Sequence, residues 1–414
     1  MKKSIAIIGG GAAALFASAF LDTKKFDVTI YEQKKSVGRK FLVAGDGGFN
    51  LSHGEDIHKM IDRYTPDYFL KNALLNFSND DLQAWLLKLD IPTFKGSSNR
   101  IYPEKGIKPI SVLSKIKQFS SDKDVRFLSD YKWKGWASDN ELIFEHQNNT
   151  ENKNTIISAD YTIFSMGGGS WKITGSDGNW LPIFEDKSIK TRPFLPSNCA
   201  YKIAWKPDFI LKNEGKPLKN IALSSSDKTQ KGELVITKFG LEGNAIYALS
   251  PEIQTQLSAN LPNKKATIFI DLKPMFTLDE IFKKINTSNY SITDILKKVL
   301  KLSPVQIDLL KAILSKEEYL NKQILSEKIK KLPLIIHDSA PLNEAISTTG
   351  GLSLDEVYEN FELKKIKNTF CIGEMLDWNA PTGGYLLQAC FSMGVFVADY
   401  LNEKYSGKKL TARG

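Results

Sequence analysis

A glycine-rich turn near the start of the chain constrains the fold most strongly. Residues 4–8 have the pattern of a short buried strand, and Gly9-x-Gly11-x-x-Ala14 follows directly, before an alanine-rich helix. In this pattern the first glycine permits a tight turn, the second lets a pyrophosphate approach the backbone, and the small third residue lets helix and strand pack closely. A second strand over 27–31 completes a βαβ unit, which predicts a parallel sheet with a crossover helix.

The residue after the second strand supports a nucleotide at this turn. Glu32 lies 18 residues beyond Ala14, close to the spacing of about 20 at which such a carboxylate accepts hydrogen bonds from a ribose. A carboxylate here disfavours a 2′-phosphate, so the site fits FAD or NAD better than NADP. The helix after Gly11 would present free N–H groups and its positive dipole end to the phosphates.

The C-terminal part favours FAD over NAD. The sequence contains no second strand, glycine turn and helix of the first kind. Instead, a predicted strand runs into Gly373-Glu374, and Gly383-Gly384 opens a predicted helix that extends to Leu401. This arrangement would bring a second helix N-terminus to the pyrimidine edge of a flavin, where negative charge develops on reduction. In isolation, the glycine pair is also compatible with a plain turn.

The pattern of the sequence changes after Pro193, from nucleotide-binding signals to short strand-like runs and then to helices. We therefore predict an α/β fold, with a Rossmann-like FAD-binding domain, an inserted small β-rich domain and a helical domain. The predicted boundaries are 1–192 with 340–414 for the FAD-binding domain, 193–240 with 331–339 for the β-rich domain, and 241–330 for the helical domain. Within the first segment we expect helices over 66–90 and 109–120 and a strand over 162–166.

Composition limits the other classes of protein. Hydrophobic residues make up 42% and charged residues 25% of the 414 residues, which is ordinary for a soluble globular protein with a large core. The three cysteines form no CxxC pair and the four histidines no HxxH pair, so we expect no metal site. No window has the roughly 18 apolar residues of a membrane span, and glycines interrupt the only signal-like run. We therefore expect a cytoplasmic protein with no membrane partner.

The net charge of +9 leaves two interpretations open. Lysines spread over polar stretches are typical of a solvated surface. The same charge would also favour binding to RNA or to another acidic partner. The sequence gives no indication of the oligomeric state.

Seven stretches carry a resemblance to a known family. They are IIGGGAAA at 7–14, VGRKF at 37–41, GGFNLS at 47–52, TKFGLEG at 237–243, TGGL at 349–352, GEMLDW at 373–378 and PTGGYLLQA at 381–389. With these motifs the chain resembles, over nearly its whole length, the HI0933-like flavoproteins, the BaiN/YhiN-type NAD(P)/FAD-dependent oxidoreductases. The resemblance implies a two-segment FAD domain, a small β-rich domain and an inserted helical domain. It also implies FAD as cofactor and NAD(P)H as a transient reductant.

The resemblance implies cofactor-binding residues at both ends of the chain. They are Gly9, Gly11, Ala13 and Ala14 around the pyrophosphate, Glu32 at the ribose, Arg39 and Lys40 near the phosphates or adenosine, Asn50 near the flavin, Trp133 beside adenine, Met166 and Gly167 at the end of a strand, and Gly373, Glu374, Gly384 and Leu386 along the ribityl chain and ring. Charge alone also favours phosphates near the two cations. The alternatives are solvated cations at 39 and 40, a turn residue at 50 and a core aromatic at 133.

One loop departs from the pattern of some relatives. Those relatives read Gly-Gly-Gly-Arg-Cys-Asn, whereas this chain has Gly48 and Phe49 at the arginine and cysteine positions. A substrate whose chemistry depends on that cysteine therefore does not transfer to this chain.

The sequence does not identify a catalytic residue. His53 and Asn50, in the loop expected beside the flavin, are the candidates, and a structural role is the alternative for each. Cys371 and Cys390 lie in apolar stretches, and we expect them to be buried and unreactive.

Three functions remain compatible with these observations. The first is an FAD-dependent oxidoreductase that is reduced by NAD(P)H and passes hydride to an unsaturated acceptor of unknown identity. The second, which the resemblance allows, is a flavin-dependent enzyme that reduces a pyrimidine in ribosomal RNA. The third is a non-catalytic flavin-binding module. The substrate would accordingly be a small molecule or RNA.

Overall fold

Two compact units make up the structure. The computed structural model describes residues 1–43, 49–146, 154–260, 262 and 264–405. Residues 1–195 and 347–414 belong to one unit, and residues 196–346 form the other. Each unit has its own hydrophobic core. The first unit is therefore discontinuous in sequence.

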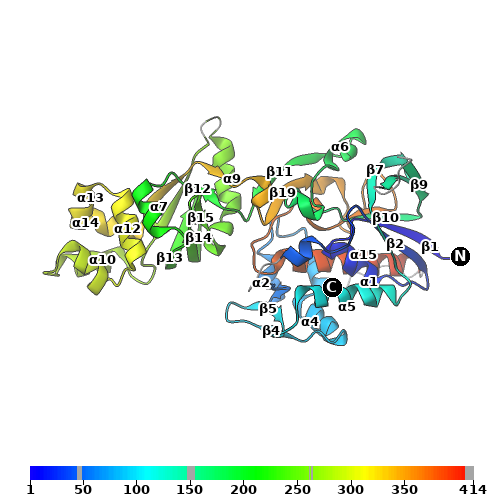
Figure 1. The fold of residues 1–414 in the computed structure, drawn as a ribbon, viewed down its shortest axis with the longest axis horizontal. Coiled ribbons are helices and arrows are strands. Elements are labelled where there is room, and N and C mark those ends of the chain that lie inside the picture. The colour runs from blue at the N-terminus through cyan, green and yellow to red at the C-terminus, as the bar shows by residue number, and fades with distance from the viewer. Residues whose placement is uncertain (44–48, 147–153, 261, 263, 406–414) are drawn as a thin grey trace. The chain divides into compact units, whose positions relative to one another are not determined.

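A five-stranded parallel sheet lies at the centre of the first unit (Figure 1). Its strands, in the order in which they pair, are β20 (Thr369–Cys371), β10 (Tyr161–Phe164), β1 (Lys3–Ile8), β2 (Phe26–Glu32) and β6 (Arg126–Ser129). Since every pair is parallel, the carboxyl ends of the strands meet at one edge, where open α/β sheets bind ligands. The prediction of a Rossmann-like α/β core is confirmed.

Three helices pack beside this sheet: α1 (Ala12–Phe20), α5 (Pro109–Ser121) and α15 (Tyr385–Tyr405). Helix α5 confirms the helix expected over 109–120. Helices α1 and α15 approach closely at Gly394, because a Cβ atom there would lie 2.4 Å from the backbone oxygen of Ala13. The glycine thus brings the last helix into backbone contact with the first.

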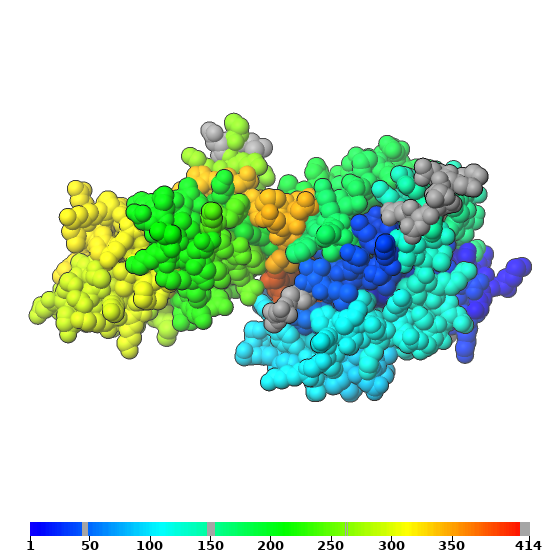
Figure 2. Space-filling view, in the orientation of Figure 1, coloured from blue at the N-terminus to red at the C-terminus, as the bar shows by residue number. Residues whose placement is uncertain are grey.

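Shorter elements complete the first unit. Two small antiparallel sheets are formed by β3 (Ser52–His53), β5 (Arg100–Pro103) and β4 (Thr93–Lys95), and by β7 (Tyr131–Ser138), β8 (Glu141–His146) and β9 (Asn154–Ser158). Strands β11 (Thr191–Ser197) and β19 (Ser347–Leu352) pair where the chain leaves and re-enters the unit. The remaining helices are η1 (Lys40–Val43), α2 (Ile57–Ile61), η2 (Lys172–Thr174), α6 (Leu181–Asp186), η5 (Leu354–Glu356) and η6 (Gly373–Met375). On the face shown in Figure 2, the blue N-terminal segment adjoins the cyan segment that contains α5.

The single helix expected over 66–90 is wrong. The chain forms α3 (Lys71–Asn76) and α4 (Asn79–Lys88) instead. The first helix ends with Phe77 as its C-cap. Ser78 caps the second helix, because its hydroxyl accepts the N–H of Asp81 while the Asp81 carboxylate accepts the N–H of Ser78. This reciprocal capping box starts a new helix in the middle of an otherwise helical apolar pattern.

The second unit contains one seven-stranded sheet and one core. Its strands, in pairing order, are β17 (Leu332–Ile336), β16 (Ala266–Asp271), β13 (Pro217–Ser225), β14 (Lys228–Ile236), β15 (Gly240–Glu242), β12 (Tyr201–Lys202) and β18 (Asp338–Ser339). Its helices are α7 (Pro207–Asn213), α8 (Asn244–Tyr247), α9 (Ser250–Ala259), α10 (Leu278–Asn286), α11 (Ile292–Asp294), the π-helix η3 (Ile295–Val299), α12 (Pro304–Ile313), α13 (Lys316–Leu320), α14 (Lys322–Lys330) and η4 (Leu342–Glu344). The division of this unit into separate β-rich and helical domains stays a prediction.

The contact between α1 and α15 predicts a stability effect at Gly394. Gly394→Leu should lower the free energy of unfolding by about 1–3 kcal/mol, because the side chain must push two backbones apart. Urea unfolding followed by circular dichroism measures this change. The control is Glu403→Leu on the same helix, where the side chain is half-exposed and we expect a change within about 0.5 kcal/mol. Equal stability of the Gly394 variant and the wild type would contradict the close contact.

Candidate functional site

The turn between β1 and α1 is held by backbone contacts with the neighbouring strands. Gly9 has φ +93°, and a Cβ atom there would lie 2.6 Å from the Ser165 carbonyl oxygen. The Gly9 N–H donates to the Tyr31 carbonyl oxygen at 2.8 Å, and the Ser165 hydroxyl donates to the Gly9 carbonyl oxygen at 2.9 Å. The turn therefore requires glycine at position 9 for both its dihedral angle and its space.

Glu32 fixes the same turn from the end of β2. One carboxylate oxygen accepts the Gly10 N–H at 2.8 Å, and the other accepts the Lys34 N–H at 2.8 Å. Burial raises the pKa of Glu32, although these two hydrogen bonds and the nearby charges of Lys34 and Arg39 act in the opposite direction. Each oxygen keeps a further lone pair, so the hydrogen bonds to Gly10 and Lys34 leave capacity for the ribose bonds that the sequence predicts.

The residues around the N-terminus of α1 fit the phosphates of a dinucleotide. Gly11 is the N-cap residue, and its helix has no side-chain cap. A Cβ atom at Gly11 would meet only the Ser165 carbonyl oxygen, at 3.9 Å, so space is open beside it. Nearby, the buried Nε atom of Arg39 has no hydrogen-bond partner within the described part of the chain. Open space, uncapped N–H groups and an unsatisfied cation together suit an anionic group.

Segments from three parts of the chain meet next to this turn. The Lys40 ammonium forms an ion pair with the Glu374 carboxylate at 2.9 Å and donates to the Ser170 hydroxyl at 3.1 Å. Gly373, at φ +82°, lies against α1, since a Cβ atom there would be 3.3 Å from the Ala13 Cβ. The structure thus brings four predicted residues from the two ends of the chain together, namely Ala13, Lys40, Gly373 and Glu374.

The other predicted cofactor residues differ in their surroundings. Trp133 is a core aromatic, with its ring against Trp136, Phe164 and Phe184. Met166 and Gly167 follow β10 instead of ending it, because that strand stops at Phe164. Met166, Gly167, Leu386 and Asn50 are partly exposed, and within the described residues the Asn50 side chain has no hydrogen bond. Cofactor contact by all of these residues stays a prediction, and Gly48 lies outside the described residues.

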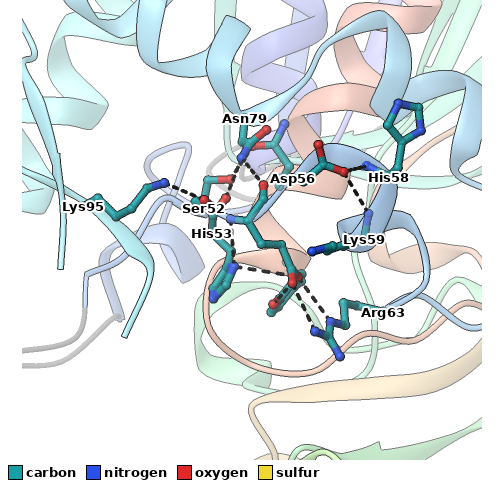
Figure 3. Close-up of polar contacts among 12 residues, drawn as sticks. Ser52, His53, Asp56, His58, Lys59, Arg63, Asn79 and Lys95 are labelled. Atoms are coloured by element: carbon teal, nitrogen blue, oxygen red, sulfur yellow. Dashed lines mark hydrogen bonds and ion pairs between the residues drawn. The ribbon is translucent and has the colours of Figure 1, made fainter. Parts of the chain in front are cut away.

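A second polar cluster surrounds the candidate residue His53 (Figure 3). At its centre is Glu55, whose side chain is 10% exposed. Arg63 donates to both oxygens of this carboxylate, at 3.2 and 3.1 Å, and the Tyr385 hydroxyl donates to one of them at 2.6 Å. The His53 ring stacks on the Tyr385 ring with centroids 4.9 Å apart. The Asn79 amide donates to the backbone oxygens of His53 and Glu55, which fixes the loop.

The cluster sets the protonation of its members. Burial lowers the pKa of His53, and the charges of Arg63 and Arg100 act in the same direction, whereas Glu55 opposes them. The His53 Nδ1 atom accepts the Glu55 N–H at 3.3 Å. Burial would raise the pKa of Glu55, but the hydrogen bonds from Arg63 and Tyr385 outweigh it and leave this pKa below its ordinary value. Both shifts favour a neutral His53 ring beside an ionised Glu55 carboxylate, which disfavours His53 as a proton donor.

The start of α15 is attached to the same loop. Gly384 has φ +105°, and a Cβ atom there would lie 2.3 Å from the backbone of Ser52. The Ser52 hydroxyl donates to the fully buried Gln388 side chain at 2.6 Å. The Tyr64 hydroxyl donates to the Tyr385 carbonyl oxygen at 2.8 Å. Predicted flavin-side residues on the two segments, Asn50 and Gly384, are thus held in one region of the fold.

Sequence reasoning missed Glu55, Arg63, Arg100 and Tyr385. Tyr385 lies inside the PTGGYLLQA motif, so the motif itself was a signal for this residue. The other three belong to no motif, and the Tyr385–Glu55 contact joins residues 330 positions apart. Only the fold brings these side chains together.

Other kinds of site find no support in the described part of the chain. It holds no group of three or more histidine, cysteine, aspartate or glutamate side chains able to bind a metal ion. Cys371 and Cys390 are buried free thiols, and burial raises the pKa of both. No helix in these residues has the length and apolar character needed to cross a membrane.

Several known proteins are similar to this chain. The sequence model of the HI0933-like protein Rossmann domain matches residues 3–400. The chain is 24% identical to the 3-dehydro-bile acid delta(4,6)-reductase of Clostridium scindens, over 94% of this chain and 97% of that protein. It is 23% identical to the ribosomal RNA dihydrouridine synthase of Haemophilus influenzae, over 93% and 95%. A solved structure, 3-ketosteroid delta1-dehydrogenase from Sterolibacterium denitrificans, is similar with a TM-score of 0.49 and 10% identity, over 97% and 100%.

The low pKa of Glu55 predicts a pH-dependent contribution to stability. The Glu55 carboxyl binds a proton less tightly in the folded protein than in the unfolded chain. Its ionised form therefore stabilises the fold above the ordinary carboxyl pKa of about 4.3. This stabilisation is lost as the pH falls through the lower pKa of Glu55 in the folded protein. Glu55→Gln should therefore lower the free energy of unfolding by about 1–3 kcal/mol at pH 7 and by less at pH 3. Urea unfolding at several pH values measures the difference.

The control for this experiment is Asp186→Asn, which removes an exposed carboxylate at the end of α6. Its unfolding free energy should stay within about 0.5 kcal/mol of the wild type over the same range. A destabilisation by Glu55→Gln that stays constant from pH 7 to pH 3 would show that its carboxylate is not held ionised by Arg63 and Tyr385.

Proposed function

Because the chain belongs to the HI0933-like family, whose model matches residues 3–400, we propose that it is an FAD-dependent oxidoreductase. In this proposal NAD(P)H is the reductant and the acceptor is an unsaturated compound. The main support for the proposal is the sheet edge where the carboxyl ends of β1, β10 and β20 meet. At this edge, residues from both ends of the chain lie around the N-terminus of α1, which has no side-chain cap. The Clostridium scindens relative, by its name a reductase, supports the same class of reaction.

In this proposal each part of the edge binds one part of FAD. Gly9 and Gly11 let the pyrophosphate approach the N-terminus of α1, and Glu32 accepts hydrogen bonds from the ribose. Gly373 and Gly384, both with positive φ, let the segments after β20 and before α15 pack against α1 and the Ser52 loop, and in the proposal these segments lie along the flavin. FAD, when bound, supplies the hydride-carrying chemistry that no side chain of the protein can perform.

The ion pair of Lys40 with Glu374 connects two segments of the proposed site. The pair joins the loop after β2 to the segment after β20 at 2.9 Å. The Glu374 side chain is 15% exposed, and Lys40 compensates its charge. The pair therefore adds little net charge beside the flavin. Its role in the proposal is to position both segments.

The first test of the proposal is the cofactor itself. The purified protein should be yellow, and anaerobic NADH or NADPH should bleach its visible absorption. A colourless protein that does not bind added FAD would rule out the proposal. Bound FAD without reduction by either nucleotide would favour a non-catalytic flavin-binding module.

Substitutions at the first turn separate cofactor binding from folding. Gly11→Val should fold, because Gly11 has φ −79° and open space around its Cβ position, yet its side chain would fill the space that the pyrophosphate needs. We expect FAD affinity to fall about 100-fold, measured by fluorescence titration of the apoprotein. Gly9→Val should instead impair folding, since its φ is positive and its Cβ would contact the Ser165 backbone. Unchanged FAD affinity of a folded Gly11→Val variant would contradict the site.

A second candidate function is the reduction of a pyrimidine in ribosomal RNA. It is favoured by the name of the Haemophilus influenzae relative and by the charge of residues 196–346, which include 22 lysines against 16 acidic residues. An excess of lysine over the second unit suits a phosphate backbone. Mass spectrometry of ribosomal RNA from a deletion strain should then show a loss of dihydrouridine relative to wild type, and an unchanged level would reject this candidate.

A further inference from the structure

Arg100 is a cation beside the Glu55 cluster that has no partner among the described residues. Its side chain, at the start of β5, is half-buried. Within the described part of the chain, its guanidinium forms no hydrogen bond and no ion pair. Half-buried arginines usually bind a carboxylate, a backbone carbonyl or a ligand, because loss of water from an unpaired charge is unfavourable.

Two neighbouring cations, Arg63 and Lys95, have hydrogen-bond partners. Arg63 binds both oxygens of Glu55, and the Lys95 ammonium donates to the Gly54 carbonyl oxygen at 2.6 Å. The one buried carboxylate of the cluster, Glu55, also accepts from Tyr385. Its carboxylate thus accepts three hydrogen bonds, none of them from Arg100, whose planar guanidinium can donate to an anion.

The position of Arg100 places this unpaired charge beside the segment expected to face the flavin. Its Nε atom would lie 3.3 Å from a Cβ atom on Gly383, directly before Gly384 and the first turn of α15. Strand β5 pairs with β3, which places Arg100 opposite His53. Asn50 and Ser52 lie on the same loop as His53.

We propose that Arg100 binds a carboxylate of the acceptor and thereby selects unsaturated substrates that carry an acidic group. The planar guanidinium can bind both oxygens of a carboxylate, whereas a neutral carbonyl has only one oxygen and no charge. Arg100 makes and breaks no covalent bond and acts as a binding and positioning residue. This inference rests on the proposed function, because the flavin-facing role of the start of α15 belongs to it.

The test uses the FAD-loaded protein and crotonate, a small α,β-unsaturated carboxylate, with neutral 2-cyclohexenone as the comparison. Binding is followed by the change in the visible spectrum of the flavin. Arg100→Gln should weaken crotonate binding about 10- to 100-fold, the loss expected for a charge-assisted bidentate contact, and leave any cyclohexenone binding unchanged. Arg100→Lys keeps the positive charge but not the planar guanidinium, so its crotonate affinity should lie between those of the wild type and Arg100→Gln. Arg126→Gln, which removes an exposed arginine on β6, is the matched control and should bind crotonate within about twofold of wild type.

A second readout is independent of turnover and of the flavin spectrum. The groups that act on His53 are Glu55, the Ser98 backbone, Arg63 and Arg100, and the Tyr385 ring stacks on it. A carboxylate bound to Arg100 adds negative charge nearby, so saturating crotonate should raise the pKa of His53 in an NMR titration. In Arg100→Gln this pKa should be higher from the start and should not respond to crotonate. A purely structural arginine would show no such response.

The outcomes separate this inference from the proposed function. A protein that is yellow and is bleached by NAD(P)H, but whose wild type fails to bind crotonate, overturns the role of Arg100 alone. Equal crotonate affinity in the wild type, Arg100→Gln and Arg100→Lys does the same, as does Arg100-dependent binding of cyclohexenone in place of crotonate. A protein without FAD would instead reject the proposed function. If Arg100→Gln does not fold, the lysine variant and the His53 titration of the wild type still decide the question.

Discussion

The close backbone contact of the first glycine turn with the ends of β10 and β20 is the constraint on which the candidate site depends. The Ser165 carbonyl lies 2.6 Å from the position of a Gly9 Cβ, and Gly373 lies 3.3 Å from Ala13 by the same measure. These approaches exist because β1, β10 and β20 are adjacent and parallel. A parallel sheet brings its carboxyl ends together regardless of how far apart they are in sequence.

Charge pairing explains why the surrounding loops have one arrangement. Lys40 joins Glu374, and Arg63 joins Glu55, each pair linking segments that the sheet alone does not connect. Breaking such a pair leaves a partly buried charge without compensation, so each pair specifies the position of its loop. Among the described residues Arg100 is the exception to this pattern, and a carboxylate of the acceptor, as proposed, would compensate its half-buried charge.

The sequence predicted the parts of the fold that depend on local chemistry. The first βαβ unit, helix α5 and the final helix α15 were all visible as strand, turn and amphipathic patterns. The expectation of a single helix over 66–90 failed at Phe77 and Ser78, where one helix ends and a capping box starts the next. That signal is present in the sequence as Ser-x-x-Asp, but the apolar period continues across it and obscures it.

The sequence by itself determined the α/β class, the glycine turn, the carboxylate at the end of β2 and the contribution of the C-terminal segment. Each of these needs only residue types at short or fixed spacings. The tertiary structure alone decided that Lys40 pairs with Glu374, that the His53 ring stacks on Tyr385, and that Arg100 has no partner among the described residues. Ion pairing and burial depend on contacts between side chains that lie far apart in sequence, and a local sequence pattern does not specify such contacts.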